Sequence, residues 1–233
     1  SLERATYEAT SRFVHDQIHD PIESHLSGAA VLAQTSTFLF TGLPQFDLPR
    51  GKQHRGPVHG VTDLSGNAKL IQGRFPRATD DELEVLIDPL GSALLNLSVG
   101  QQFGLRPADT GSSSGLSFPV RIVGIIEPID PDDAYWQLGF PARATERGRE
   151  WITMPLYADL DATFETIGSN YPGLYTIFYW LFFVDSDAVQ ASDVSSLRAT
   201  LLSARRQLFN TWSTPYWETN LDDLLERYNI LMT

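Results

Sequence analysis

The chain has 233 residues, of which 42% are hydrophobic and 11% aromatic, enough to bury the core of one large domain or two small ones. Its 29 acidic and 17 basic residues give a net charge of −12, which disfavours nucleic acids and anionic lipid surfaces as partners because both are polyanions. There is no cysteine, which excludes disulfides, thiolate metal ligands and cysteine nucleophiles.

The first part of the chain predicts a helix followed by a strand and a loop. Residues 1–24 carry apolar side chains at helical spacing, and Pro21 favours a kink or an end near Asp20. No capping residue precedes this helix, so the chain opens in mid-element. A strand is expected at 29–40, and a loop rich in proline, glycine and basic residues at 42–57.

The middle of the chain predicts short strands separated by turns. Strands are expected at Glu84–Ile87 and at 118–128, where apolar residues alternate with others. Between them, Asp88 stands directly before Pro89, a pair typical of the start of a helix. The middle region is therefore predicted to be rich in strands and turns, whereas the two ends are predicted to be rich in helices.

The stretch LYTIFYWLFFVD, from Leu174 to Asp185, is almost continuously apolar. It is too short for a membrane-spanning helix, which needs about 20 such residues. Its aromatic and β-branched residues predict a central strand that is buried on both faces. Truncation of Phe182 to alanine is then expected to cost about 3–5 kcal/mol.

Two helices are expected after this strand. Residues 192–212 carry apolar side chains on one face and predict an amphipathic helix. A final helix is predicted to begin at Asn220, and it has no stop signal before Thr233. The sequence shows neither a signal peptide nor a membrane-spanning segment.

The stretch GSSSG at 111–115 matches the G-x-S-x-G pattern of a nucleophile elbow, with Ser113 in the place of the nucleophile. Such an elbow needs a helix directly after the serine. Here a predicted strand that contains a proline follows instead. We interpret the stretch as a flexible hairpin loop and expect the chain to have no hydrolytic activity.

His15 and His19 stand four residues apart, a spacing that zinc ligands use on one helix face, and Asp16 occupies the place of a metalloprotease glutamate. A third ligand is not evident, and His25 would join only if the chain turned back. We interpret the two histidines as solvated, expect no metal, and expect micromolar zinc to leave the melting temperature almost unchanged.

The stretch DPDDAYW at 130–136 gathers three carboxylates, but it lacks the alternating ligands and the glycine of a calcium loop. We predict a solvated turn beside packed Tyr135 and Trp136. Neither phosphate-binding pattern, G-x-x-x-x-G-K-[ST] or G-x-G-x-x-G, occurs, so no nucleotide or other cofactor is expected. Carboxylate pairs of the glycosidase kind stay open. No catalytic residue is assigned.

A more specific series of motifs lies within 70–106 and 118–136. In chain order they are Gly73-Arg74-Phe75-Pro76, Glu84 to Ile87, Leu97-Ser98-Val99-Gly100 and Arg121-Ile122-Val123-Gly124-Ile125. In order and spacing they resemble the extracytoplasmic domain of FtsX-type ABC transporter permeases, the MacB-like periplasmic core domain. The last third of the chain resembles this family more loosely. Residues 41–60 match none of its motifs, and their fold is not predicted.

The resemblance implies an α+β fold: a mixed sheet with packed helices, an inserted smaller β-rich subdomain, and stalk helices at both ends. The expected boundaries are 1–24 for the N-terminal stalk helix, 25–59 with 146–219 for a porter-like sheet-and-helix unit, 60–145 for the insert, and 220–233 for the start of the C-terminal stalk. In such permeases this domain lies between the first two membrane helices, which agrees with a chain that opens and closes inside helices.

The function implied is that of a non-catalytic domain on the extracytoplasmic face of the cell membrane. It would couple ATP hydrolysis in the cytoplasm to substrate export or to mechanical signalling outside the membrane. The implied partners are a cytoplasmic ATP-binding subunit, a second permease copy and an extracytoplasmic protein. One alternative is a docking module that activates a periplasmic or cell-wall enzyme, and a remote one is a secreted hydrolase. The sequence does not identify the substrate.

Overall fold

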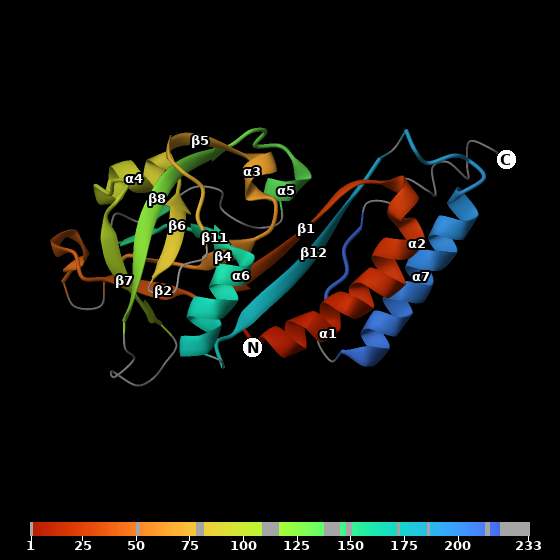
Figure 1. The fold of residues 1–233 in the computed structure, drawn as a ribbon, viewed down its shortest axis with the longest axis horizontal. Coiled ribbons are helices and arrows are strands. Elements are labelled where there is room, and N and C mark those ends of the chain that lie inside the picture. Colours follow the sequence, from red (N-terminus) through yellow and green to blue (C-terminus); the bar gives the residue numbers. More distant parts are fainter. Residues whose placement is uncertain are drawn as a thin grey trace. The chain divides into compact units, whose positions relative to one another are not determined.

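The chain forms two compact units in a computed structural model that describes residues 2–49, 52–77, 82–108, 117–137, 145–147, 151–171, 173–185, 187–212 and 215–219. One unit, here called the sheet unit, comprises Ser1–Thr6 and Ala30–Leu181. The other, here called the helix unit, comprises Tyr7–Ala29 and Phe182–Thr233. The predicted α+β fold class is confirmed (Figure 1).

The strands of the described residues belong to one mixed sheet. They are β1 (Leu26–Thr35), β2 (Phe38–Thr41), β3 (Arg55–Gly56), β4 (Val58–Val61), β5 (Ala68–Gly73), β6 (Leu83–Ile87), β7 (Gln102–Pro107), β8 (Phe118–Pro128), β9 (Thr145–Arg147), β10 (Trp151–Thr153), β11 (Leu156–Asp159) and β12 (Thr176–Val184). Their order is β12-β1-β4-β11-β6-β8-β7-β2-β3-β10-β9, and β5 also pairs with β8. The pairs β6–β8, β4–β11 and β3–β10 are parallel.

Short helices connect these strands within the sheet unit. They are the 3-10 turn η3 (Pro44–Phe46), α3 (Leu64–Asn67), α4 (Pro89–Leu95), α5 (Ala134–Gln137), α6 (Leu160–Thr163) and the π-helical turn η4 (Phe164–Gly168). The predicted start of α4 is confirmed, because the Asp88 side chain accepts a hydrogen bond from the Gly91 N–H and Pro89 occupies the first turn.

The core of the sheet unit surrounds β6, whose five residues are all buried. This strand lies inside the strand order, between β11 and β8, and burial of every residue is typical of a strand that is covered on both faces. A cluster of aromatic rings extends this core toward η3, where Phe46 packs edge-on against Phe103 at 5.5 Å. The fold of residues 41–60, which the sequence left open, is thus η3 followed by β3 and β4.

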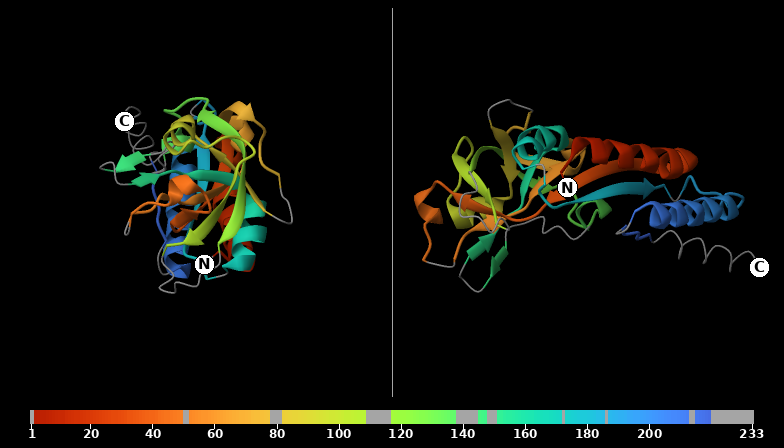
Figure 2. Two further views of the ribbon diagram at one scale, coloured as in Figure 1. Left: turned by 90° about the vertical axis from the view of Figure 1, so that its left-hand side faces the viewer. Right: turned by 90° about the horizontal axis from the view of Figure 1, so that it is seen from below.

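The helix unit contains most of the first helix and a long helix near the end of the described chain. The first runs through α1 (Arg4–Val14), the π-helical turn η1 (His15–His19), α2 (Asp20–Ile22) and the 3-10 turn η2 (Glu23–His25). The second, α7 (Val194–Thr211), buries Val194, Leu197, Leu201 and Ala204 on one face, which confirms the predicted amphipathic helix. Figure 2 shows α7 as one continuous helix.

Two predictions about strands are wrong. The single strand expected at 29–40 is two strands, β1 and β2, which pair with different partners. The strand β12, expected at the centre of the sheet and buried on both faces, lies at one end of the strand order. Seven of its nine residues are only half-buried, and Ile177 is 37% exposed. Among the strands of the described residues, β12 has a paired neighbour on one side, β1.

The predicted domain boundaries remain predictions. Residues 60–145, expected to form an inserted subdomain, share the sheet unit with residues 30–59 and 146–181. The C-terminal stalk helix expected at 220–233 and the GSSSG loop at 111–115 lie outside the described residues. In the described part of the chain, no helix is both long enough and apolar enough to cross a membrane.

Candidate functional site

The four motifs of the resemblance meet around β8. The first motif begins at Gly73, whose φ of +82° lies in the left-handed region. A Cβ atom there would lie 2.1 Å from the Val123 carbonyl oxygen, so a larger residue does not fit. The next residue, Arg74, donates its N–H to that same oxygen at 2.9 Å. The glycine thus turns the chain so that the first and fourth motifs touch.

An ion pair joins the first motif to the second. The Arg74 guanidinium donates to both carboxylate oxygens of Glu84 in β6, at 2.6 and 2.5 Å, and the Arg77 N–H donates to one of them at 2.8 Å. The side chain of Glu84 is 5% exposed. Hydrogen bonding to Arg74 lowers the pKa of Glu84, and the Arg77 N–H lowers it further against the opposing effect of burial. The carboxylate is therefore held charged, in a structural role.

The third motif closes the other side of this cluster. Gly100, with a φ of +90°, donates its N–H to the Ile122 carbonyl of β8 at 2.7 Å. The Arg121 guanidinium donates to the Gly100 carbonyl at 3.1 Å and also binds Glu82. We call this assembly of the four motif segments the motif cluster. Its residues fix backbone turns and pair charges.

A small cavity beside β4 is too small for a substrate. Its volume of about 10 Å³ has room for at most one water molecule. His59 lines it and is wholly buried, and this burial lowers the pKa of His59 to about 3. Tyr157 packs edge-on against the imidazole at 5.3 Å. Since the imidazole is neutral and closed off, we interpret it as part of the core.

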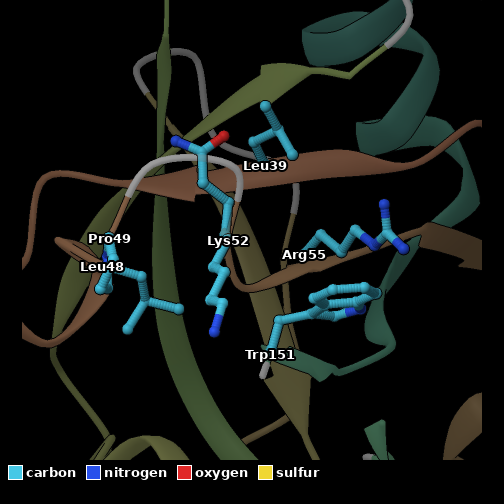
Figure 3. A pocket seen from close by; sticks show the side chains of 7 residues that line it. Leu39, Leu48, Pro49, Lys52, Arg55 and Trp151 are labelled. Carbon is cyan, nitrogen blue, oxygen red and sulfur yellow. The ribbon is translucent and has the colours of Figure 1, made fainter. Parts of the chain in front are cut away.

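An open hollow of about 470 Å³ lies on the sheet unit (Figure 3). Its lining residues come from β2, the loop after η3, β3 and β10; they are Leu39, Leu48, Pro49, Lys52, Gln53, Arg55 and Trp151. The Arg55 guanidinium lies over the Trp151 ring at 4.9 Å, a cation–π contact. Among the described residues, the lining provides cations and apolar side chains, and it contains no carboxylate, hydroxyl or imidazole.

The residues of DPDDAYW lie as predicted. The N–H groups of Asp132 and Tyr135 donate to the carboxylates of Asp130 and Asp133, so these acids cap an exposed turn. The Tyr135 hydroxyl donates to the Thr62 carbonyl at 3.0 Å, and the Trp136 indole N–H is likewise bonded to the backbone. Both rings are 6% exposed. The predicted solvated turn beside two packed aromatic side chains is confirmed.

The histidine pair in the helix unit lies differently from the expectation. The rings of His15 and His19 are stacked, with centroids 4.9 Å apart, and the Asp20 carboxylate approaches both. The third potential ligand, which the sequence did not reveal, is therefore Asp20. Asp16 is farther away, 3.8 Å from His15, and His25 lies instead 3.4 Å from Asp193. The expectation that no metal binds stays a prediction, since the structure shows only that three potential ligands lie together.

Comparisons with known proteins give weak structural likenesses only. No family model matches the chain, and no curated protein matches it. Among solved structures, the extracellular domain of the noncanonic ABC-type transporter YknZ from Gram-positive bacteria is similar, with a TM-score of 0.40 and 12% identity over 82% of this chain and 83% of that one. With this TM-score and identity, the likeness carries no argument about function.

Proposed function

We propose that the chain is the non-catalytic extracytoplasmic domain of an FtsX-type ABC transporter permease. The observation that carries this proposal is the motif cluster. Four short motifs that resemble this family in order and spacing also meet in space, through Gly73, the Arg74–Glu84 ion pair and Gly100. The local geometry requires each of these residue types. The motif residues therefore resemble the family in the structural roles that they have as well as in their identities.

The proposed role is mechanical. The described hollow lacks catalytic side chains and the small cavity has no room for a substrate, which supports a domain that acts by moving. The helix unit contains long amphipathic helices, and packed helices shift as rigid elements between discrete arrangements. A cytoplasmic ATP-binding subunit would drive the shift through the membrane part of the permease, and a second permease copy would complete a dimer.

The proposal is tested in the full-length permease, reconstituted with its ATP-binding subunit in lipid nanodiscs. The chain has no cysteine, so Glu8→Cys on the exposed part of α1 provides one spin label per copy once cysteines elsewhere are replaced. We expect the label-to-label distance in the dimer to differ between the nucleotide-free and the vanadate-trapped states. Unchanged distance distributions in a complex with normal ATPase activity would contradict the proposal.

The docking alternative predicts the same motion with a different output. A transport domain moves a substrate across the bilayer of proteoliposomes, whereas a docking domain raises the activity of a separate cell-wall enzyme and moves no substrate. Both outputs are measured with a permease whose ATP-binding subunit cannot hydrolyse ATP as the control.

A further inference from the structure

Three potential metal ligands meet on one turn of the first helix. The Asp20 Oδ1 atom lies 3.1 Å from His15 Nδ1 and 3.3 Å from His19 Nδ1. One ligand atom from each of the three residues lies within 4.8 Å of the others. The three side chains are 61%, 25% and 50% exposed for His15, His19 and Asp20, so solvent reaches the cluster.

The helix geometry brings these residues together. In a regular α-helix, with about 100° per residue, residue i+5 lies about 140° around the axis from residue i. Asp20 would then face away from His15. Here the Asp20 N–H donates to the His15 carbonyl, the i→i+5 bond of a π-helical turn. The wider turn places Asp20 over His15 while His19 stays on the same face. Such turns are frequent at functional sites.

The distances suit a tetrahedral ion. Zinc binds imidazole nitrogen and carboxylate oxygen at about 2.0–2.2 Å, so two ligand atoms of a tetrahedral site are about 3.4 Å apart. The nitrogen-to-oxygen distances in the cluster are close to this value. Two imidazoles and one carboxylate are also a recurring three-ligand set for zinc, with water in the fourth position. Because His15 and Asp20 are exposed, small rotations of their side chains cost little.

We propose that His15, His19 and Asp20 form a zinc-binding site, which replaces the sequence-based expectation that no metal binds. Zinc holds the π-helical turn closed, because its ligands lie on both sides of the i→i+5 bond. The turn lies against α7 within the helix unit, so binding stiffens the part of that unit where the two helices meet. The inference is independent of the proposed transport function.

The test is zinc binding to the purified chain without an affinity tag, measured by competition with a fluorescent zinc chelator at pH 7.5. We expect one zinc ion per chain with a dissociation constant of about 1–10 µM, weaker than four-ligand structural sites. His15→Ala, His19→Ala and Asp20→Asn should each raise this constant at least about tenfold, since loss of even a group behind a ligand has an effect of that size.

The matched control is Glu8→Gln, which removes one exposed carboxylate from the same helix, seven residues before His15 (15 − 8). It should leave the dissociation constant within about twofold, since zinc is held by its ligands rather than by net charge. Circular dichroism without zinc checks that each variant folds. The proposal is wrong if the chain shows no saturable binding below 100 µM zinc, or if the three ligand variants bind as tightly as the wild type. Equal weakening by Glu8→Gln would likewise overturn it in favour of non-specific attraction.

Discussion

The strands β6 and β12 differ in a way that their sequences alone do not suggest. β12 (TIFYWLFFV) is entirely free of charge and rich in aromatic residues, whereas β6 (LEVLI) contains a glutamate. Yet all five residues of β6 are buried, and most of β12 is half-buried. The difference agrees with the places of the two strands among the described residues: β6 has a paired strand on each side, and β12 lies at the end of the strand order beside β1.

The burial of the residues in β6 and β12 follows the position of each strand in the sheet rather than its apolar content. Glu84 is tolerated in the centre because Arg74 and the Arg77 N–H satisfy its charge. The rings of β12 gain part of their contact area from one another, as in the Phe178–Trp180 pair at 6.0 Å, and from neighbouring rings such as Phe164. Large aromatic side chains therefore stay ordered at an edge where smaller apolar residues would gain little.

Leucine-to-alanine truncation offers a matched test of the two strands. Leu86 in β6 is 0% exposed, and we expect Leu86→Ala to lower the free energy of unfolding by about 3–5 kcal/mol. Leu181 in β12 is half-buried, and Leu181→Ala should cost about 1–2 kcal/mol because less area is removed from water. Urea unfolding measures both values. Equal losses of unfolding free energy for Leu86→Ala and Leu181→Ala would contradict the conclusion that β6 is more deeply buried than β12.

The contribution of Glu84 in β6 to stability should depend on pH. The folded state lowers the pKa of Glu84, so its charged form stabilises the fold above the ordinary pKa of about 4.3 and this stabilisation is lost as the pH falls through the folded-state pKa. We expect Glu84→Gln to cost about 1–3 kcal/mol at pH 7, moderated because Arg74 is partly exposed.

The measurement for Glu84 is urea unfolding of wild type and Glu84→Gln from pH 7 down to acid. The difference between the two proteins should shrink as the pH falls from about 4.3 through the lower folded-state pKa, because the carboxylate of the unfolded wild type takes up a proton over this range while the folded one is still charged. A difference that stays constant over this range would show that the Arg74–Glu84 charge pair contributes nothing.

Phe182 gives an expected effect as small as that of Leu181. The sequence led us to expect a cost of about 3–5 kcal/mol for Phe182→Ala, a figure for full burial. Since Phe182 is half-buried in β12, we now expect about 1–2 kcal/mol. Thermal and urea unfolding of the isolated chain measure this cost. A value above 3 kcal/mol would place this strand in the core after all.

Local patterns predicted much of the fold. The Asp88-Pro89 start of α4, the amphipathic face of α7 and the strand β6 depend on residues close in sequence, and all were predicted. The order of the strands depends on contacts between distant segments, which is why the edge position of β12 was missed. The fold around Phe46 was missed for the same reason, since its aromatic partners come from other strands.

Two of the three residues of the candidate metal site stand out in the sequence, but they were interpreted as solvated and no metal was expected. The spacing of His15 and His19 is visible in the sequence, because four residues correspond to one helical turn. Asp20 was missed because its approach to His15 requires a π-helical turn, for which no simple sequence rule exists. Pro21, directly after Asp20, was the one local signal that the helix is not regular at this point.

The most direct test of the account is the location of the chain in the cell. A single cysteine at Glu8, in the full-length protein with its other cysteines replaced, is treated in intact cells with a maleimide that does not cross the cytoplasmic membrane. A cytosolic cysteine protein serves as the control for leakage. We predict labelling at Glu8→Cys in intact cells without labelling of the control. Labelling at this position only after the cells are permeabilised would place the domain in the cytoplasm and contradict the account.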